Sequence, residues 1–407
     1  MTDAAQQPRK RIAIITTVWH YLSHAQHMGD RFLVGYPWNG RWHDSALQVV
    51  SLYVDQRGKG DQSDARANEF GFQVYPTIAE ALRCGTDKLA VDGVVIIGEH
   101  DDYWVNPKGQ IQYPRHEFFE QSAAVFEADG RSVPVFNDKN LSFSFDKASQ
   151  MVATAKKLGF PILAGSSLPV TWRLPPVEVP LGAMLEEALM VGVGGSDAMD
   201  YHALEAMQCM LERRRGGETG VKAVQLIEGP EVWKAGTDGR WSRRLLEAAL
   251  SRSTSRSGLG MKDGRPQDWT RGGEVESLVP SPAAYLIEYN DGLRATLLML
   301  NGAVQDYTFA CKLRDEPTII STQFLLPVTP NVVYSACLMR GVEEMITTGK
   351  APYPVERTLI TCGILDRCLD SKVQGHRRLP TPELRVHYQP PEAPRYGDPP
   401  VLSNHLR

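Results

Sequence analysis

The sequence of 407 residues lacks long apolar runs and paired cysteine motifs. No stretch approaches the roughly 18 apolar residues of a membrane span, and the polar N-terminus lacks the apolar core of a secretory signal. The six cysteines include no C-x-x-C pair, which excludes the common zinc and redox spacings. We therefore expect a cytoplasmic protein with reduced thiols.

An excess of charge of one sign is also missing. Lys plus Arg number 44 and Asp plus Glu 48, so the net charge is only −4. This balance provides no global positive field for nucleic acid or an anionic membrane. We therefore expect a small-molecule partner, with no nucleic acid and no membrane. At about 100 to 200 residues per domain, the length predicts two domains.

Short apolar runs alternate with helical patterns through the first part of the chain. Strands in a parallel sheet that is covered on both faces are continuously apolar. The predicted strands are residues 12–15, 47–54, 92–97, 133–136 and 161–164, and the predicted helices are 63–70, 77–83, 116–128 and 144–158. This alternation predicts a Rossmann-type, doubly wound parallel α/β domain over residues 1–168. Its ligand should bind at the carboxyl ends of the strands.

The pattern changes in the second half, over residues 169–350. A helix is predicted at 201–214 and strands at 222–228, 284–290, 293–300 and 304–313. The turn sequences at 290–292 and 301–302 are typical of hairpins and predict a large, mostly antiparallel sheet. Helices are predicted at 332–348 and 355–371. Residues 351–407 should pack back on the first domain and end in an extended, Pro-rich tail. An exposed apolar face at 297–300 predicts a homodimer or tetramer.

Glycine is missing where a dinucleotide-binding domain needs it. Such a domain has G-x-G-x-x-G directly after its first strand, because side chains there keep the pyrophosphate away from the backbone. Here the chain reads Thr16-Thr17-Val18-Trp19-His20-Tyr21. Asp55 ends the second predicted strand, as if to bind a ribose, but lies beyond the usual distance of about 20 residues. An inserted loop at 35–42 explains that spacing. Thr16, Thr17, Val18 and Asp55 are the cofactor-binding candidates.

Three further motifs carry a family resemblance. They are Tyr113-Pro-Arg-His116 at a helix start, Asp138-Lys139-Asn140 after a strand, and Gly194-Gly-Ser-Asp-Ala-Met-Asp-Tyr-His202-Ala-Leu-Glu205. With them, the chain resembles the glucose-fructose oxidoreductase / inositol dehydrogenase (Gfo/Idh/MocA) family over most of its length. It departs from the family at Asn140, where a Pro is expected, and at Ala198, where an Asp is expected. It resembles a divergent member without the glycine-rich loop.

The resemblance implies a Rossmann-type domain followed by an α+β domain, and an enzyme acting on a sugar, cyclitol or glycoside with NAD or NADP. Lys139 would lie beside the nicotinamide and the reacting hydroxyl, and His202 would be the general base. The structural alternatives are a lysine paired with Asp138 or another carboxylate, and a histidine that caps or packs within its helix.

The substrate-binding candidates are Glu99, His100, His116, Arg173 and Tyr201. Glu99 and His100 begin a dense polar cluster at a strand end, which is suited to sugar hydroxyls, to a divalent metal, or to an ordinary polar loop. Arg173 lies in the crossover between the predicted domains. It is a candidate anchor for a substrate hydroxyl or carboxylate, or one half of an interdomain salt bridge.

Histidine is concentrated in the first half of the chain. His20, His24 and His27 have the spacing of one helical face and would ligate a divalent metal if Glu99 or Asp138 reached them. The alternative is a helix in which histidine merely replaces other polar residues. Three functions therefore remain open: an NAD(P)-dependent oxidoreductase, a nicotinamide-independent, metal-assisted lyase, hydrolase or isomerase, and a non-catalytic sugar-binding protein.

Overall fold

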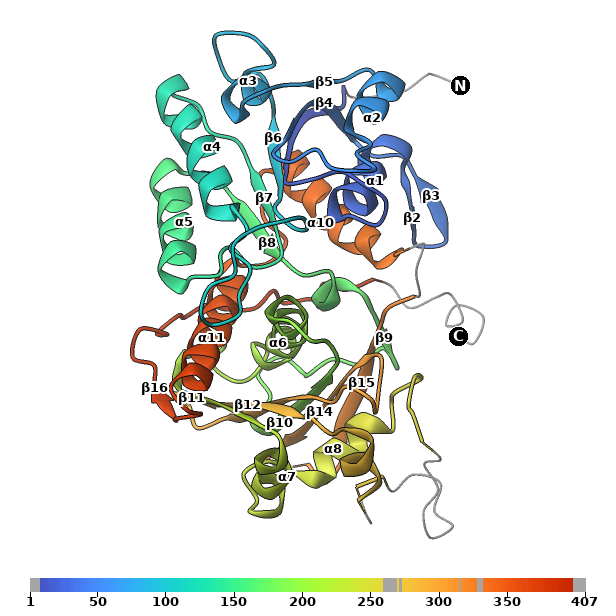
Figure 1. Cartoon of the computed structure of the whole chain (residues 1–407), viewed down its shortest axis with the longest axis vertical. Helices are drawn as coiled ribbons and strands as arrows, with labels where there is room; N and C mark the ends of the chain where they lie inside the picture. The colour runs from blue at the N-terminus through green and yellow to red at the C-terminus, as the bar shows by residue number, and fades with distance from the viewer. Residues whose placement is uncertain (1–7, 259–268, 271–272, 315, 328–331, 398–407) are drawn as a thin grey trace.

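The computed structural model describes residues 8–258, 269–270, 273–314, 316–327 and 332–397, which form two large sheets (Figure 1). The first sheet is parallel, with the order β5-β4-β1-β6-β7-β8. Its strands are β1 (Lys10–Thr16), β4 (Leu47–Val54), β5 (Gln73–Val74), β6 (Gly93–Ile97), β7 (Val135–Asp138) and β8 (Ile162–Gly165). The predicted doubly wound parallel sheet is confirmed.

Helices cover both faces of this sheet, which explains the continuously apolar strands. Ala13 and Ile15 belong to one buried cluster, and Ile12 and Ile14 belong to the other. One face carries α3 (Ile78–Arg83), α4 (Arg115–Asp129) and α5 (Phe145–Leu158); the other carries η1 (Ala25–Gly29), α1 (Asp30–Val34), α2 (Ser63–Phe70) and α10 (Tyr334–Thr348). α10, which comes from late in the chain, therefore completes the helical layer on that face of the parallel sheet.

The predicted insertion at 35–42 is a hairpin of β2 (Tyr36–Trp38) and β3 (Arg41–His43). Its turn residues Asn39 and Gly40 both have positive φ, the backbone geometry that favours the Asn-Gly sequence found there.

The second sheet has eight strands in the order β16-β11-β12-β13-β10-β14-β15-β9. They are β9 (Trp172–Leu174), β10 (Leu185–Gly192), β11 (Val221–Glu228), β12 (Ala283–Tyr289), β13 (Arg294–Met299), β14 (Tyr307–Leu313), β15 (Ile319–Leu325) and β16 (Leu379–Pro380). All neighbours are antiparallel except β10 and β13, so the predicted mostly antiparallel sheet is confirmed.

One of the two predicted hairpins is wrong. Residues 290–292 do join the antiparallel pair β12 and β13. Residues 301–302 do not close a hairpin, because β10 lies between β13 and β14. Asn301 instead fixes a crossing loop, where its Oδ1 accepts a hydrogen bond from Gly194 N at 2.8 Å. The error follows from β10, which the sequence pattern did not reveal.

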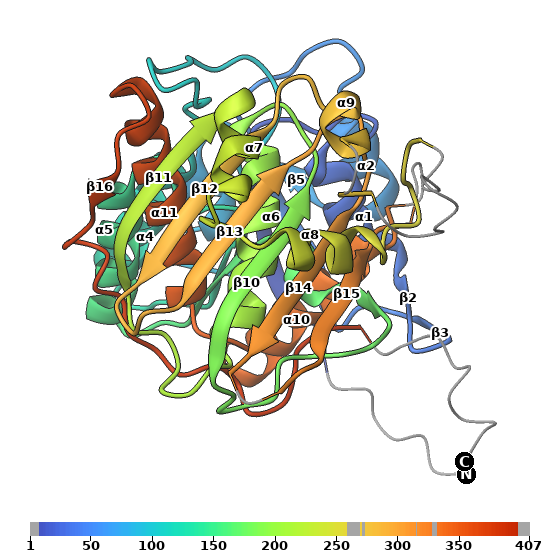
Figure 2. The same cartoon turned by 90° about the horizontal axis from the view of Figure 1, so that it is seen from below.

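Both faces of the second sheet are covered by the chain itself. α6 (Asp197–Leu211) and α11 (Glu356–Val373) lie on the face toward the first sheet, and α7 (Pro230–Thr237), α8 (Arg243–Leu250) and α9 (Glu274–Leu278) lie on the other face, as Figure 2 shows. Leu298 and Leu300 pack there with Trp241 and Leu246. The predicted exposed apolar face at 297–300 is therefore wrong, because these helices bury it. The dimer or tetramer stays a prediction, and the surface on which it was based is not exposed.

The last part of the chain contacts both sheets. α11 packs against α5, α6 and β11, while β16 pairs with β11 and the side chains of Leu384 and Tyr388 are buried. Residues 398–407 of the predicted Pro-rich tail lie outside the described residues. The domain limits at 168 and 350 stay predictions. In the described part of the chain, no helix is long and apolar enough to cross a bilayer.

Candidate functional site

The carboxyl ends of β6 and β7 lie on the edge of the parallel sheet that faces α6 (Figure 1), and Glu99 and Lys139 follow these two strands. Glu99 accepts a hydrogen bond from Lys139 Nζ at 2.7 Å and another from Arg115. None of the three is more than 5% exposed. Burial alone would raise the pKa of Glu99, but the two cations outweigh burial and hold that pKa well below its ordinary value. The lysine is therefore paired, with Glu99 rather than Asp138.

The backbone around this cluster is held in an unfavourable conformation. Lys139, His100 and Asp101 have φ of +60°, +74° and +72°. Such left-handed conformations cost non-glycine residues on the order of 1 kcal/mol or more each, and they concentrate at functional sites. Lys139 N donates to Gly165 O at 3.1 Å, which ties the strained turn to β8.

His202 reaches the same edge from α6. Its Nδ1 lies 2.5 Å from Ser166 Oγ, and Ser166 N donates to the carboxylate of Glu205 one turn further along α6. Burial, followed by the nearby charge of Lys139, lowers the pKa of His202 well below its ordinary value, so the imidazole is neutral. A Cβ at Gly165 would lie 2.6 Å from Glu205 Oε1, so only glycine allows this close approach.

A second histidine is held by a carboxylate. His24 Nδ1 lies 2.5 Å from Oδ2 of Asp138, which is completely buried. The rings of His27 and His100 lie 4.9 and 5.0 Å from that of His24. Burial is the main reason that the pKa of His27 falls to about 2 and that of His100 to about 4.

The predicted helical face of three histidines is wrong. His20 lies in a loop before the helical segment, and its ring faces that of His100 at 6.0 Å. Within the described ranges, no group of three or more His, Cys, Asp or Glu has the geometry to hold a metal ion. The metal-assisted alternative therefore gains no support.

The structure does not bring the remaining substrate-binding candidates into this cluster. Arg173 is buried between the rings of Phe324 and Tyr396, and its Nη2 lies 3.3 Å from Glu178. The partner is only five residues away in the same predicted domain, so this salt bridge is local and is not the interdomain bridge that was the alternative. Tyr201 is fully buried in the core. His116 lies 3.7 Å from Glu120.

Sequence reasoning missed Arg115 and Ser166. Arg115 precedes the residue that was selected, His116, and its signal was a charged residue at a helix start just after a polar insertion. Ser166 stands in the Gly-Ser-Ser run at the end of β8. A serine hydroxyl accepts and donates hydrogen bonds but carries no charge, so nothing in the sequence marked the contact of Ser166 with His202.

The cofactor-binding candidates form a closed region at β1. The chain stays extended beyond the strand, because Asp55 N donates to Thr16 O and Gln56 N donates to Thr17 O. On the other side, Thr16 Oγ1 donates to Ile97 O and Thr17 Oγ1 to Glu99 O, at 2.9 and 2.5 Å. A dinucleotide domain needs the backbone to turn away here and leave a crevice.

A bridge of side chains crosses the same region. Asp55 at the end of β4 accepts hydrogen bonds from Tyr53 at 2.9 Å and from Tyr103 at 2.7 Å, one on each carboxylate oxygen. Gln56 Nε2 also donates to Asp102 O at 3.1 Å. Loops from β4 and β6 therefore meet across β1, and the carboxylate expected to bind a ribose is already occupied. The residues present do not fit a dinucleotide in the usual position.

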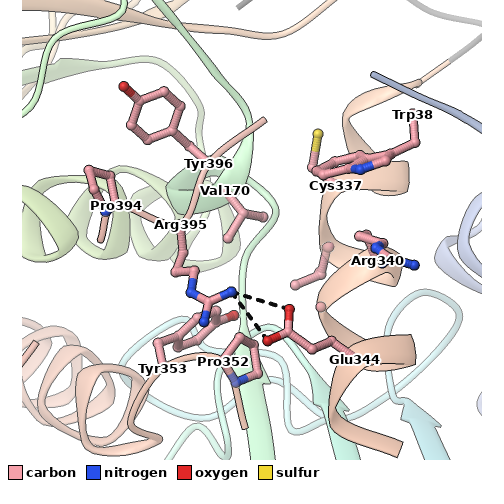
Figure 3. Close-up of a pocket in the computed structure, with 12 residues that line it drawn as sticks. Trp38, Val170, Cys337, Arg340, Glu344, Pro352, Tyr353, Pro394, Arg395 and Tyr396 are labelled. Carbon is pink, nitrogen blue, oxygen red and sulfur yellow. Dashed lines mark hydrogen bonds and ion pairs between the residues drawn. The ribbon is translucent and has the colours of Figure 1, made fainter. Parts of the chain in front are cut away.

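Two cavities lie near these elements. One of about 180 Å³ borders the closed region and shares Val18 and Gln56 with it, and His20 also lines it. Another of about 280 Å³ lies between α10 and the segment 394–396 (Figure 3). Arg395 lies 3.2 Å from Glu344 at its edge. The larger cavity is not lined by Glu99, Lys139, Arg115, His24 or His202.

Comparison with known proteins defines the class of fold. No family model and no curated protein matches the chain. Solved structures do. GenD2 from gentamicin A biosynthesis, in complex with NAD, is 14% identical and matches with a TM-score of 0.54 over 93% of this chain and 98% of its own. A myo-inositol dehydrogenase from Lactobacillus casei, in complex with NAD(H) and myo-inositol, is 10% identical, with a TM-score of 0.52 over 91% and 96%.

A probable dehydrogenase from Thermotoga maritima is 11% identical, with a TM-score of 0.55 over 92% of this chain and 99% of its own. The chain therefore has the two-domain fold of Gfo/Idh/MocA-type dehydrogenases. The resemblance expected from the sequence is confirmed at the level of this fold.

Proposed function

We propose that this chain is an enzyme that moves a proton at a carbon next to a carbonyl of a sugar or cyclitol, with Lys139 and His202 as the acid–base pair. The observation that carries the proposal is the buried Lys139–Glu99–Arg115 cluster, because its charge perturbs the neutral His202 across the same edge. Groups of this kind with shifted pKa values concentrate at catalytic sites. The substrate class rests on the fold shared with the myo-inositol dehydrogenase.

The step is balanced without an oxidant. His202 accepts the proton from the carbon next to the carbonyl, and the electron pair of that C–H bond moves to form an enolate. The Lys139 ammonium stabilises the negative charge that develops on the oxygen. Return of the proton to the same carbon or to a neighbouring one gives an epimer or an isomer. Glu99 and Arg115 hold the lysine in place, and His100 is left to bind a hydroxyl.

A second candidate is oxidation of a substrate hydroxyl with NAD or NADP. The specific observation in its favour is the fold, which is shared with structures solved in complex with NAD or NAD(H). The closed region at β1 weighs against it.

The test is solvent exchange without nucleotide. The purified chain is incubated in D₂O with a panel of ketoses, aldoses and cyclitol ketones, and NMR follows the loss of C–H signals next to the carbonyl. We expect exchange or epimer formation with at least one compound, reduced about 100-fold or more in His202→Gln. Exchange absent from the whole panel, together with nicotinamide reduction when NAD⁺ or NADP⁺ and a polyol are supplied, would favour the second candidate.

A further inference from the structure

We propose that His24 is a second catalytic acid–base group, positioned by Asp138, and that the enzyme is a two-base epimerase. His202 removes the proton from one side of the carbon, and His24 delivers a proton to the other side. This inference rests on the proposed function and specifies its reaction: inversion of one carbinol carbon next to a carbonyl in a sugar or cyclitol.

The first support is the geometry of the pair. Asp138 ends β7 and is fully buried, and its Oδ2 lies 2.5 Å from Nδ1 of His24, whose side chain is 14% exposed. A carboxylate accepts only, so Nδ1 carries the hydrogen and Nε2 is the nitrogen that exchanges protons. The buried Asp138 Oδ1 has no hydrogen-bond partner in the described part of the chain. The carboxylate therefore serves to fix the tautomer and orientation of one imidazole.

The second support is the segment that carries His24. The residues that replace the glycine-rich loop form a rigid turn, in which Ser23 Oγ accepts from His20 N at 3.1 Å and from Gln26 N at 3.2 Å. Gln26 Oε1 accepts from Leu22 N at 3.0 Å, and Leu22 has φ of +61°. Such capping interactions fix a helix start. The segment that would hold a pyrophosphate in a dinucleotide domain instead holds an imidazole beside Lys139.

Charged groups surround His24. Asp138 contacts its Nδ1, and His24 and the carboxylate of Glu99 act on each other electrostatically. The charge of His24 lowers the pKa of His27 and of His100, and so does the Lys139 ammonium. Among the described residues, His24 is the one of these three imidazoles with a carboxylate within hydrogen-bond distance. His27 and His100 are held neutral by burial, so they cannot replace it as a proton donor.

The third support is that the two imidazoles belong to different layers of the molecule. His24 directly precedes η1, whose Ala25 and Met28 pack on the parallel sheet, and His202 belongs to α6 on the second sheet. Each lies close enough for the charge of His24 to lower the pKa of His202, after the larger effects of burial and of Lys139. A planar enolate between two layers presents one face to each. Inversion needs no net oxidation: one proton leaves for His202, and one arrives from His24.

The experiment compares exchange with inversion in D₂O. The substrate is the compound of the panel that the wild-type chain exchanges or epimerises. A two-base enzyme places deuterium in the product while the remaining substrate stays unlabelled in the first turnovers. His24→Gln should keep the exchange of substrate hydrogen through His202, but lose epimer formation about 100-fold or more. His20→Gln is the matched control on the same segment and should behave as wild type, because the His20 Nδ1 bonds to the backbone oxygen of Tyr21 and not to a carboxylate.

Asp138→Asn tests the positioning role separately. An amide can donate to Nδ1, which selects the wrong tautomer, so we expect a lower kcat with KM unchanged within about two-fold. The imidazole ¹⁵N signals of His24 should show the Nδ1–H tautomer in the wild type and a change in this variant. These signals also test the pair in the wild type alone, should a variant fail to fold.

The outcomes separate the two proposals. Wild-type exchange with unchanged epimerisation in His24→Gln would overturn the two-base inference and leave the proposed function standing. Deuterium entering the substrate pool as fast as the product forms would do the same, because a single base then serves both faces. A wild-type chain that exchanges no compound of the panel would overturn the proposed function, and the inference with it.

Discussion

The carboxyl edge of the parallel sheet has two halves that differ in what occupies them. At β1 and β4 the chain makes hydrogen bonds within itself. Thr16 and Thr17 bond to the ends of both neighbouring strands, and the Tyr103 hydroxyl donates to the Asp55 carboxylate. At β6 and β7 the same edge carries Glu99, Lys139 and other ionisable groups that are buried together. The half that binds adenosine in a dinucleotide domain is closed by hydrogen bonds, and the other half carries buried, paired ionisable groups.

This difference shows that the fold can be kept while a few residues at the usual cofactor position change. The sheet, its covering helices and the second domain are those of a dehydrogenase fold. Chemistry depends on the site and not on the fold. In this chain the loop after β1 carries side chains where such a domain has glycine, and His24 follows on the same segment. Four substitutions test the comparison.

The largest effect is expected from Lys139→Met. Without the ammonium, no group at this position stabilises the developing oxyanion, and activity in the exchange assay should fall by a factor of about 10² to 10⁴. Lys147→Met is the control, because Lys147 pairs with Glu117 at the surface. Comparable activity in the two variants would mean that the β6 and β7 half is structural.

Glu99→Gln should mainly affect stability. The change leaves the buried Arg115 and Lys139 without their common counter-charge, which costs about 3 to 5 kcal/mol of the free energy of unfolding. Denaturant unfolding measures this loss. Glu117→Gln removes a carboxylate from an exposed pair and should change the free energy by less than about 0.5 kcal/mol. A loss below about 1 kcal/mol in Glu99→Gln would show that the cluster is hydrated and not buried.

Glu205 gives a pH dependence of stability. Burial raises the pKa of this carboxyl from its ordinary value of 4.5 to about 7. Between these two values the folded state binds more protons than the unfolded state, so stability falls as pH rises and is lowest above pH 7. Relative to Glu205→Gln, the wild type should lose about 1 to 3 kcal/mol between pH 4.5 and 7. Parallel stability curves for the two proteins would contradict this.

The smallest effect is expected from Asp55→Asn. Its carboxylate binds two tyrosine hydroxyls in the closed half, at an exposed position, so exchange activity should change by less than about two-fold. Steady-state kinetics measures kcat and KM. If the chain used a dinucleotide in the usual way, the same change would raise the KM for the nucleotide, and the contrast between the halves would disappear.

Local signals explain how much of the fold could be predicted. β4 and α2 have the predicted bounds, 47–54 and 63–70. An apolar run marks the strand, and a polar segment that ends at a glycine marks the helix. β10 was missed because Glu186 and Glu187 interrupt its apolar pattern and its pairing with β13 is non-local. The helices over the outer face of the second sheet were missed too, and with them the burial of Leu298.

The site was predicted in part for a similar reason. Parallel strands end at one edge, so Glu99, His100 and Lys139 were expected there together. That Lys139 pairs with Glu99, that Arg115 joins them and that Asp138 binds His24 depends on side-chain directions across 16 to 114 residues of sequence. No periodicity carries that information.

The most direct test of the account is equilibrium binding of NAD⁺, NADH, NADP⁺ and NADPH to the purified chain, by calorimetry and by nicotinamide fluorescence. A closed region at β1 predicts no saturable binding up to about 1 mM, a limit that corresponds to a binding free energy of about −4 kcal/mol. Stoichiometric binding at micromolar concentration that weakens in Asp55→Asn would contradict it and show that the crevice opens for the cofactor.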